Sequence, residues 1–399
     1  MNLNEFTFFN PNRISYGVKK LDQTITKEIK RTKKSHAFLA TDSGLVQTGM
    51  VDRISKLLKD QGVAVHVFSD VEPNPHAGTV MRGVSEYKEH GCDFLLAVGG
   101  GSPMDFAKAV GVAVSHEGSV LDYVYGREPI VHKLPLLICV PTTVGTGSEV
   151  TSVAVITDEQ QERKYVLASP FLTPNLAIVD PTLTLTLPRH VVAATGMDAF
   201  VHAIESYTST LANPITDGIA LQAMKMLKEH LLPSYAHPSN MESRSQIHLA
   251  STMAGIAFNT AGLGVVHACS HPMSAVFQVP HGLANAIILP KAIEYNLISN
   301  YKKYADIARI LDSSLNAVSD EQAANALVDL LEKFNEQLDI PTDFSYIEGV
   351  EPEHLEVLTH DALHDQLTIP MNPRKVEKTD IEKIYKTLIP QFNKELANY

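Results

Sequence analysis

The sequence predicts an α/β domain with a parallel sheet over residues 1–185 and an all-helical domain over residues 186–399. In the first half, short apolar strands alternate with amphipathic helices, which indicates a parallel sheet covered on both faces. From about Pro188 the strand signals stop and long helical stretches follow one another. At 399 residues the chain is also long enough to form two hydrophobic cores.

The individual elements follow from hydrophobic periodicity. Strands are expected at residues 36–41, 63–68, 93–98, 134–140, 153–157 and 176–179. Helices between them are expected at residues 47–59, 79–90 and 103–114. The clearest helices of the second half are expected at residues 215–229, 244–259, 301–311, 321–337 and 379–388. The segment from Asp180 to Pro188 is expected to be the hinge between the domains.

A glycine-rich turn, Gly99 to Gly101, follows the third predicted strand. Glycines let backbone N–H groups approach a ligand closely. We expect Ser102 to cap the following helix and Pro103 to occupy its first position, so that the helix N-terminus can bind a phosphate. The turn lacks the G-x-G-x-x-G pattern, so a tight capped turn without a ligand explains this segment equally well.

A loop rich in hydroxyl groups follows the fourth predicted strand. It runs from Pro141 to Glu149, and its hydroxyl groups belong to Thr142, Thr143, Thr146 and Ser148. Open α/β sheets hold nucleotides at the carboxyl ends of their strands, so this loop favours a nucleotide site. Asp42, just after the first predicted strand, could accept hydrogen bonds from a ribose and repel a 2′-phosphate, although its position alone is better explained by a role in a helix cap or turn.

The second half contains a carboxylate and several histidines at helical spacing. Asp198 and His202 are four residues apart, so on a helix they share one face. His267 and His271 repeat that spacing, and His281 opens another helical stretch. An aspartate with three imidazoles suits zinc, iron or nickel and leaves a coordination position for substrate. A single histidine is better explained as a core or capping residue, but the whole set predicts a divalent metal site.

A nucleotide domain joined to a metal-binding helical domain favours dehydrogenation of an alcohol. A divalent cation is a Lewis acid that lowers the pKa of a bound hydroxyl, so an alcohol becomes an alkoxide near neutral pH. The alkoxide carbon can then give hydride to a nicotinamide ring. In reverse, the cation polarises an aldehyde carbonyl so that it receives hydride.

Composition excludes several other classes of function. The net charge of −12 argues against binding to nucleic acid or to an anionic membrane surface. The three cysteines, Cys92, Cys139 and Cys269, form no C-x-x-C pair and suit a reducing compartment. The N-terminal segment lacks the layout of a signal peptide, and no segment approaches the roughly 20 apolar residues of a membrane span. We therefore expect a soluble, cytoplasmic protein.

Four segments resemble the iron-containing (group III) alcohol dehydrogenases. They are VGGGSPMDFAK, PTTVGTGSE, ATGMDAFVHAIESY and GLGVVHACSHPMSAVFQVPHGLANAIILP. The similarity extends from FFNPNR to DALHDQLTIPMNPR, which covers essentially the whole chain. It implies a Rossmann-like N-terminal domain, a helical metal-binding domain and a homo-oligomer. It also implies NAD as cofactor and a small primary alcohol or diol, or the matching aldehyde, as substrate.

The resemblance assigns the metal ligands to Asp198, His202, His267 and His281. The expected ion is Fe²⁺, with Zn²⁺ or another divalent cation as the alternative, because zinc outcompetes ferrous iron at most such sites. His271 resembles the non-coordinating histidine near the nicotinamide, so it is expected to relay a proton towards solvent.

The resemblance also identifies the cofactor-binding positions. They are Asp42, Asn74, Gly100, Gly101, Ser102, Thr142, Thr143, Thr146, Thr151 and Lys164. The residues from Gly100 to Ser102 match the pyrophosphate turn, and the threonines from Thr142 to Thr146 match the loop around the phosphates and adenosine. Asp42 matches the aspartate associated with a preference for NAD over NADP. Asp105 is a family signature residue for which a structural role and a direct contact are equally expected.

One segment departs from the family pattern, and two alternative functions remain. Relatives often carry a C-T-G-G-N-P-R-like run, whereas residues 367–374 read LTIPMNPR, without the cysteine and one residue longer, which changes the expected substrate pocket.

One alternative is a lyase of the dehydroquinate synthase type, which needs several basic residues in its metal domain. The segment from Ala261 to Pro290 has none. The other alternative is a non-catalytic metal- or nucleotide-binding protein.

Overall fold

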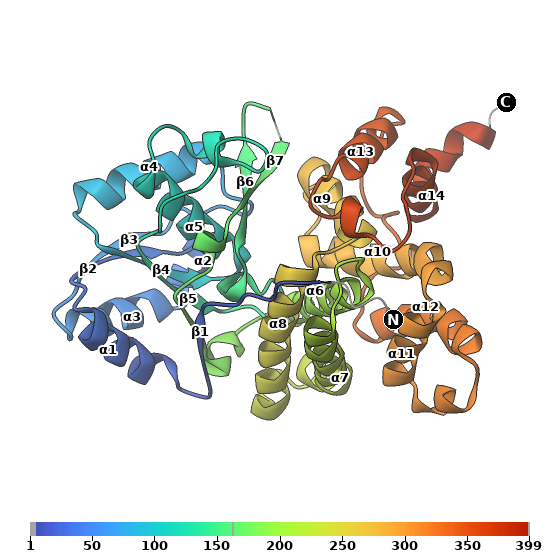
Figure 1. Cartoon of the computed structure of the whole chain (residues 1–399), viewed down its shortest axis with the longest axis horizontal. Helices are drawn as coiled ribbons and strands as arrows, with labels where there is room; N and C mark the ends of the chain where they lie inside the picture. Colours follow the sequence, from blue (N-terminus) through green and yellow to red (C-terminus); the bar gives the residue numbers. More distant parts are fainter. Residues whose placement is uncertain (1–4, 162, 398–399) are drawn as a thin grey trace. The chain divides into compact units, whose positions relative to one another are not determined.

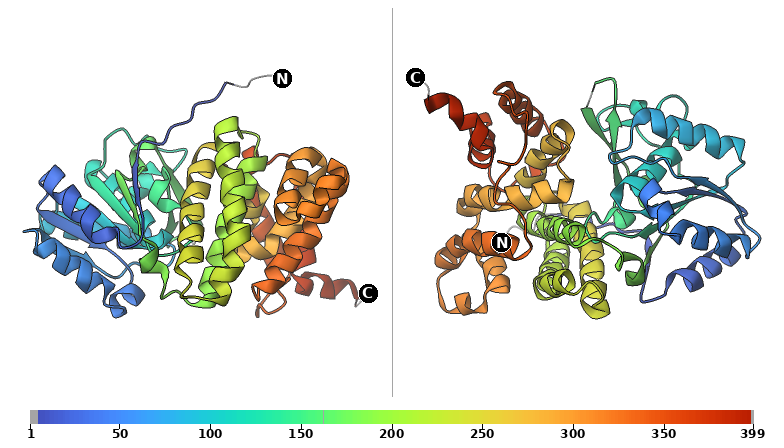
Figure 2. Two further views of the ribbon diagram at one scale, coloured as in Figure 1. Left: turned by 90° about the horizontal axis from the view of Figure 1, so that it is seen from below. Right: turned by 180° about the vertical axis from the view of Figure 1, so that it is seen from behind.

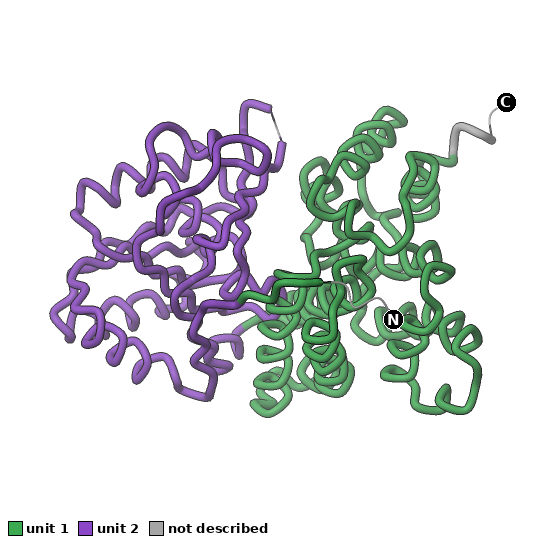
Figure 3. Tube along the Cα trace, viewed as in Figure 1, with its two compact units in different colours: residues 1–9, 187–399 green, residues 10–186 purple. Residues whose placement is uncertain are grey.

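The computed structural model describes residues 5–161 and 163–397. The chain forms two compact units: residues 10–186, here called the α/β unit, and residues 1–9 with 187–399, here called the helical unit (Figure 3). The division falls between Thr186 and Leu187. The domain limits 1–185 and 186–399 stay a prediction.

In its described part, the α/β unit contains a six-stranded sheet in the order β1-β8-β5-β4-β2-β3, with every pair parallel (Figure 1). Its strands are β1 Arg13–Tyr16, β2 His36–Ala40, β3 Ala64–Phe68, β4 Phe94–Gly99, β5 Leu136–Pro141 and β8 Leu176–Val179. The helices are α1 Leu21–Thr32, α2 Ser43–Gln47, α3 Met50–Lys59, α4 Ala77–Glu89 and α5 Gly101–Ser115. A separate antiparallel hairpin joins β6 Val153–Asp158 to β7 Arg163–Ala168.

Helices cover both faces of this sheet (Figures 1 and 2). Successive residues of β2 illustrate the two layers, because side chains alternate along a strand. Phe38 belongs to the core that includes residues of α4 and α5, and Leu39 belongs to the core that includes residues of α1 and α3. Both residues are fully buried. A parallel sheet buried on both faces confirms the predicted α/β class.

Several elements differ from the sequence prediction. β1 was not predicted, because its four residues are half-exposed and lie at the sheet edge. The predicted helix over residues 47–59 corresponds to α3, which begins only at Met50 because Gly49 before it adopts a left-handed φ of 76°, and α2 was not predicted. The predicted strand at residues 153–157 is present but pairs with β7 rather than joining the main sheet.

The strand order creates a switch point at β2 and β4, which are neighbours. The chain leaves β2 towards β3 on one side, and it leaves β4 towards β5 on the other. The loops after β2 and β4 therefore diverge from a common point at the carboxyl edge of the sheet. Open α/β sheets bind ligands at such points.

In the helical unit, the described residues from 187 onwards contain no strand, as the sequence predicted. Its helices are α6 Arg189–Thr208, α7 Pro214–Ala236, α8 Met241–Ala261, α9 Val265–Val276, α10 His281–Asn296, α11 Tyr301–Leu311, α12 Asp320–Gln337, α13 Glu353–Leu363 and α14 Lys378–Leu388. α6, α7 and α8 pack side by side (Figure 2). Within the described chain, no single helix has the length and apolarity to cross a membrane, and α8 and α9, bent by 107°, meet that test only as a pair.

Two glycines allow α6 to pack closely against its neighbours. A Cβ added at Gly196 of α6 would lie 2.3 Å from Leu231 Cδ1 of α7. A Cβ added at Gly282 of α10 would lie 2.4 Å from the backbone oxygen of Ala194 in α6. A backbone atom cannot move away as a side-chain end can, so only glycine permits this approach between α10 and α6.

The Gly282→Ala variant is therefore expected to push α10 away from α6 and to lower the free energy of unfolding by about 1–3 kcal/mol, as overpacking typically does. Urea denaturation measures this change. The matched control is Gly218→Ala in α7, where a new Cβ meets no atom within 4 Å. That control should raise stability by about 0.4–1 kcal/mol. Equal stability of the two variants would contradict the packing argument.

Candidate functional site

Helix α6 presents Asp198, His202 and Glu205 at positions i, i+4 and i+7, so all three lie along one face. All three side chains are buried, with exposed fractions of 2%, 4% and 5%. Polar groups at this depth need partners, because an unpaired buried polar group costs free energy. The face of α6 that carries them is therefore a polar site within the helical unit.

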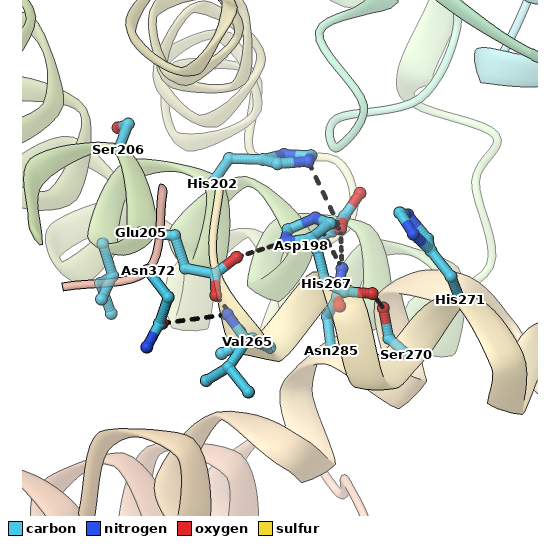
Figure 4. A network of polar contacts seen from close by, with 12 residues as sticks. Asp198, His202, Glu205, Ser206, Val265, His267, Ser270, His271, Asn285 and Asn372 are labelled. Carbon is cyan, nitrogen blue, oxygen red and sulfur yellow. Dashed lines mark hydrogen bonds and ion pairs between the residues drawn. The ribbon is translucent and has the colours of Figure 1, made fainter. Parts of the chain in front are cut away.

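Three histidine side chains from three helices converge on Asp198, and Figure 4 shows two of them, His202 and His267, beside it. The Nε2 atoms of His202, His267 and His281 lie 4.0, 3.9 and 3.9 Å from Asp198 Oδ1. Asp198, His267 and His281 each offer one ligand atom, and these atoms lie within 4.8 Å of one another. The structure thus brings together the four side chains that the sequence singles out as ligands, from α6, α9 and α10.

This donor set fits a divalent cation. Nitrogen and oxygen ligands lie about 2.0–2.2 Å from such an ion, so two ligand atoms of one ion are at most about 4.4 Å apart. Burial, and then the neighbouring His202, hold the pKa of His267 well below its usual value. The neutral imidazole keeps the lone pair that a metal requires. The Asp198 carboxylate supplies the negative charge that a buried cation requires.

Glu205 is a residue of this site that the sequence reasoning missed. Its Oε2 lies 2.5 Å from His267 Nδ1, and its Oε1 accepts a hydrogen bond of 2.7 Å from the backbone N–H of Val266. Burial raises the pKa of Glu205 to about 7, while the backbone N–H groups act in the opposite direction. Its spacing of seven residues from Asp198 was the available signal, because it places both on one helical face.

Asn285 is a second residue that the sequence reasoning missed. It lies four residues after His281 on α10, and its Nδ2 donates to Asp198 Oδ1 at 2.7 Å. The same nitrogen lies 3.1 Å from His267 Nε2 and 3.2 Å from His281 Nε2. The carboxamide therefore contacts the inward-facing atoms of three proposed ligands.

His271 lies apart from the ligand atoms. Its Nδ1 is 2.9 Å from Asp365 Oδ2, and its ring stacks on His281 with the centroids 5.3 Å apart. Burial opposes ionisation of Asp365, but the hydrogen bond with His271 and other donors lower the pKa of its carboxyl group overall. The His271 side chain is 28% exposed, which leaves it a path to solvent.

In the α/β unit, the glycine turn and the hydroxyl-rich loop pack directly against each other. Gly99 has a left-handed φ of 151°, and its carbonyl accepts a 2.9 Å hydrogen bond from the N–H of Thr142. A Cβ at Gly100 would lie 3.1 Å from Thr143 Cγ2, and one at Gly101 would lie 2.9 Å from Thr146 Cγ2. The glycines thus let the loops after β4 and β5 meet beside the switch point.

The prediction that Ser102 caps the helix, with Pro103 in its first position, is wrong. Helix α5 begins at Gly101, and Gly100 is its N-cap without a side-chain hydrogen bond. The left-handed conformation of Gly99 completes the turn early, so the helix starts before the serine. The Ser102 hydroxyl instead accepts a 3.3 Å hydrogen bond from the N–H of Asn74. This contact ties the turn to the loop after β3.

Asp42 caps a helix, as the alternative reading of its position expected. Its Oδ1 accepts a 2.9 Å hydrogen bond from the N–H of Leu45 in the first turn of α2. The residue nevertheless stands at the carboxyl end of β2, next to the switch point. A capping role and a contact with a ribose are therefore compatible at this position.

A buried polar network supports the hydroxyl-rich loop. Lys108 Nζ donates to Ser148 Oγ at 2.9 Å and to Thr151 Oγ1 at 3.1 Å. Ser148 Oγ in turn donates to Asp105 Oδ1 at 2.7 Å. Burial raises the pKa of Asp105 and lowers that of Lys108, and each charge opposes the shift of the other. Asp105 therefore belongs to this supporting network, and a direct contact with the cofactor stays a prediction.

Asn74 and Lys164 belong to segments beside this network. Asn74 adopts a left-handed φ of 54°, and its carbonyl accepts a hydrogen bond of 3.2 Å from Thr157 Oγ1. Lys164 pairs with Thr157 across the β6–β7 hairpin. Burial lowers the pKa of Lys164 to about 8. A lysine with a weakened hydration shell is suited to an anionic ligand, which would restore its charge.

Comparison with known proteins gives matches over both units. The family described as iron-containing alcohol dehydrogenase matches residues 11–181, and the Fe-containing alcohol dehydrogenase family, C-terminal, matches residues 192–389. The choline dehydrogenase of Bacillus subtilis is 38% identical over 382 residues, which cover 95% of this chain and 94% of that protein. The NAD-dependent methanol dehydrogenase of Bacillus methanolicus is 36% identical over 361 residues, which cover 90% of this chain and 94% of that protein. A solved structure of 1,3-propanediol oxidoreductase matches with a TM-score of 0.93 at 35% identity. The match covers 97% of this chain and 100% of that one.

The His267→Ala variant is expected to lose one equivalent of tightly bound metal, because it removes a buried ligand atom from the set. Loss of an orienting partner alone typically lowers metal affinity by about 10- to 100-fold, so loss of the ligand should lower it by more than about 100-fold. Calorimetric titration of metal-stripped protein with Zn²⁺ measures this affinity. The control is His237→Ala, which removes an exposed histidine of the same unit. Wild-type affinity in His267→Ala would argue against this ligand set.

Proposed function

The chain belongs to the iron-containing alcohol dehydrogenase family, and from that premise we propose that it transfers hydride between NAD and a small primary alcohol or diol, or the matching aldehyde. The observation that carries this proposal is the convergence of three imidazoles on one Asp198 carboxylate oxygen. The names of similar proteins, which include choline dehydrogenase and 1,3-propanediol oxidoreductase, support a small hydroxylated substrate.

In this proposal, Asp198, His202, His267 and His281 hold the cation. The family points to Fe²⁺ as this cation, and Zn²⁺ is the alternative because it binds more tightly than Fe²⁺ to most such sites. Either ion would act as a Lewis acid that lowers the pKa of the substrate hydroxyl. Burial of Asp198 and His267 keeps water from the ligand atoms and strengthens their electrostatic effect. His271 would pass the proton towards solvent, and its contact with Asp365 orients its ring for that role.

The α/β unit would bind NAD at the switch point. The proposed binding residues are Asp42, Asn74, Gly100, Gly101, Ser102, Thr142, Thr143, Thr146, Thr151 and Lys164. The close approach of the glycine turn to the threonine loop supports this assignment, because it gathers backbone N–H groups and hydroxyls at one edge of the sheet. The carboxylate of Asp42 after β2 favours NAD over NADP, because it would repel a 2′-phosphate.

We further infer that the enzyme works in the cytoplasm as a homo-oligomer. All three cysteines are free and buried, which suits a reducing compartment. The oligomer rests on the family resemblance. A lyase of the dehydroquinate synthase type is not favoured, because both halves of the chain match alcohol dehydrogenase families.

The test of the proposed function is NAD reduction by the purified, metal-loaded protein. With ethanol, propanol, propanediol and choline as substrates, we expect the absorbance of reduced nicotinamide to rise with at least one of them, and faster with NAD than with NADP. Chelation should abolish the activity, and Fe²⁺ or Zn²⁺ should restore it. If metal-loaded protein reduces no NAD with any of these substrates, or if stripped protein is fully active, the proposal is wrong.

The Lys164→Met variant is expected to bind NAD about 10-fold or more weakly, because a hydrogen bond to a charged group contributes about 1.5–3 kcal/mol. In wild-type protein without NAD, the pKa of Lys164 is about 8, so its side chain is cationic below this pH and neutral above it. Anion binding favours the cation, so the NAD affinity should be fully present below pH 8 and fall as the pH rises through 8. Fluorescence titration at several pH values measures both effects.

Two control variants sharpen the Lys164 experiment. Lys164→Arg keeps a charge at all accessible pH values, so it should flatten the fall in affinity above pH 8. Lys27→Met removes an exposed lysine of α1 in the same unit and should leave the affinity for NAD unchanged. The assignment of Lys164 fails if its methionine variant behaves like Lys27→Met.

A further inference from the structure

We propose that Glu205 is a positioning residue of the metal centre: it fixes the tautomer of His267 and the start of helix α9 together. The inference rests on the proposed function, because it assumes that His267 and its three partners hold a metal. Glu205 contacts no substrate or cofactor in this proposal. It acts through His267, whose Nδ1 lies 2.5 Å from Glu205 Oε2.

Glu205 takes the place of an N-cap for α9. The helix begins at Val265 after Gly264, which has no side chain to accept a hydrogen bond from the free N–H groups of the first turn. Glu205 Oε1 accepts from the N–H of Val266 at 2.7 Å, and the N–H of Gly264 also donates to Glu205. The carboxylate charge lies at the positive end of the helix, where it is stabilising. The position of His267, three residues into this helix, therefore depends on Glu205, together with Asn372, whose Oδ1 accepts from the N–H of Val265 at 3.1 Å.

The same contacts determine where His267 carries its proton. Backbone N–H groups that donate to Glu205 favour its ionised form, which can only accept, and in that form His267 Nδ1 is the donor in the contact with Glu205 Oε2. The other ring nitrogen, Nε2, then carries the lone pair, which can accept from Asn285 Nδ2 at 3.1 Å, and it is the atom that lies 3.9 Å from Asp198 Oδ1. The opposite tautomer would direct a proton at the other ligands and exclude a metal.

Charge balance gives Glu205 a further effect. Both His267 and Glu205 are almost completely buried, as is Asp198. A divalent cation at this depth is costly unless nearby negative charge compensates it. Asp198 supplies one charge directly, and Glu205 in its ionised form supplies a second through the imidazole of His267. Glycine at position 264 keeps this arrangement possible, because a Cβ there would lie 3.0 Å from Glu205 Oε1.

The decisive variant is Glu205→Gln. Its amide oxygen can still accept from Val266, but its NH₂ group must then face His267 Nδ1, which forces the imidazole proton onto Nε2. We expect the affinity of metal-stripped protein for Zn²⁺ to fall about 10- to 100-fold, the usual effect of removing an orienting partner. Glu205→Asp, which keeps the carboxylate, should recover part of this loss. Calorimetric titration measures the affinities.

A second readout separates orientation from a merely structural role. The ¹⁵N chemical shifts of the His267 ring, assigned by comparison with His267→Ala, report which nitrogen carries the proton. Metal-stripped wild-type protein should show the Nδ1–H tautomer and Glu205→Gln the Nε2–H tautomer. An Nε2–H tautomer in wild-type protein overturns the inference even if Glu205→Gln does not fold. A loss of affinity in Glu205→Gln without a change of tautomer also overturns it.

A matched control and the His267→Ala variant distinguish the remaining outcomes. Glu332→Gln removes a carboxylate of α12 that pairs with Lys291 at 3.1 Å and should bind Zn²⁺ as wild type does. If His267→Ala loses the metal while Glu205→Gln binds it normally, the inference fails and the proposed function stands. If neither the wild-type protein nor His267→Ala binds Zn²⁺, the proposed function itself fails.

Discussion

The helical unit depends on one constraint: three imidazole nitrogens from α6, α9 and α10 meet at a single carboxylate oxygen of Asp198. Asp198, His202 and His267 of this cluster are buried, and buried polar atoms are costly unless each has a partner, so the helices that carry them must be held closely together. Gly282 provides this closeness between α10 and α6, and Glu205 ties the start of α9 to α6. The contacts that hold these helices together therefore also orient the proposed ligand atoms.

In the α/β unit, a buried lysine rather than helix packing holds the candidate site in place. Its candidate ligand site is made of loops, which cannot rely on a hydrophobic face for their shape. Lys108, buried beneath the hydroxyl-rich loop, donates to three acceptors that include Ser148 and Thr151. These bonds hold the end of the loop, and Thr143 and Thr146 earlier in the loop stay partly exposed. A charged side chain in the interior thus gives a polar loop the rigidity that regular structure gives a strand.

Much of this arrangement could be predicted from local patterns in the sequence. Helical spacing brought out Asp198 and His202, and apolar strands between helices predicted the parallel sheet. Partners from distant segments had no such signal, because periodicity shows which face a residue occupies but not what covers that face. Glu205 and His267 are 62 residues apart, and His271 and Asp365 are 94 apart. The misplaced helix start at Ser102 has a related cause, because it depends on the φ angle of Gly99 rather than on the capping preference of serine.

Residues 367–374, the segment expected to depart from the family pattern, are tied to the start of α9. Asn372 Oδ1 accepts from the N–H of Val265 at 3.1 Å, so residues 367–374 anchor the same end of α9 that Glu205 holds. Asn372 also exchanges two hydrogen bonds with Asn296, of 3.0 and 2.9 Å. The anchoring asparagine comes after the short turn at Ile369–Met371. An added residue or a lost cysteine before this anchor can therefore reshape that stretch while the start of α9, and with it His267, keeps its place.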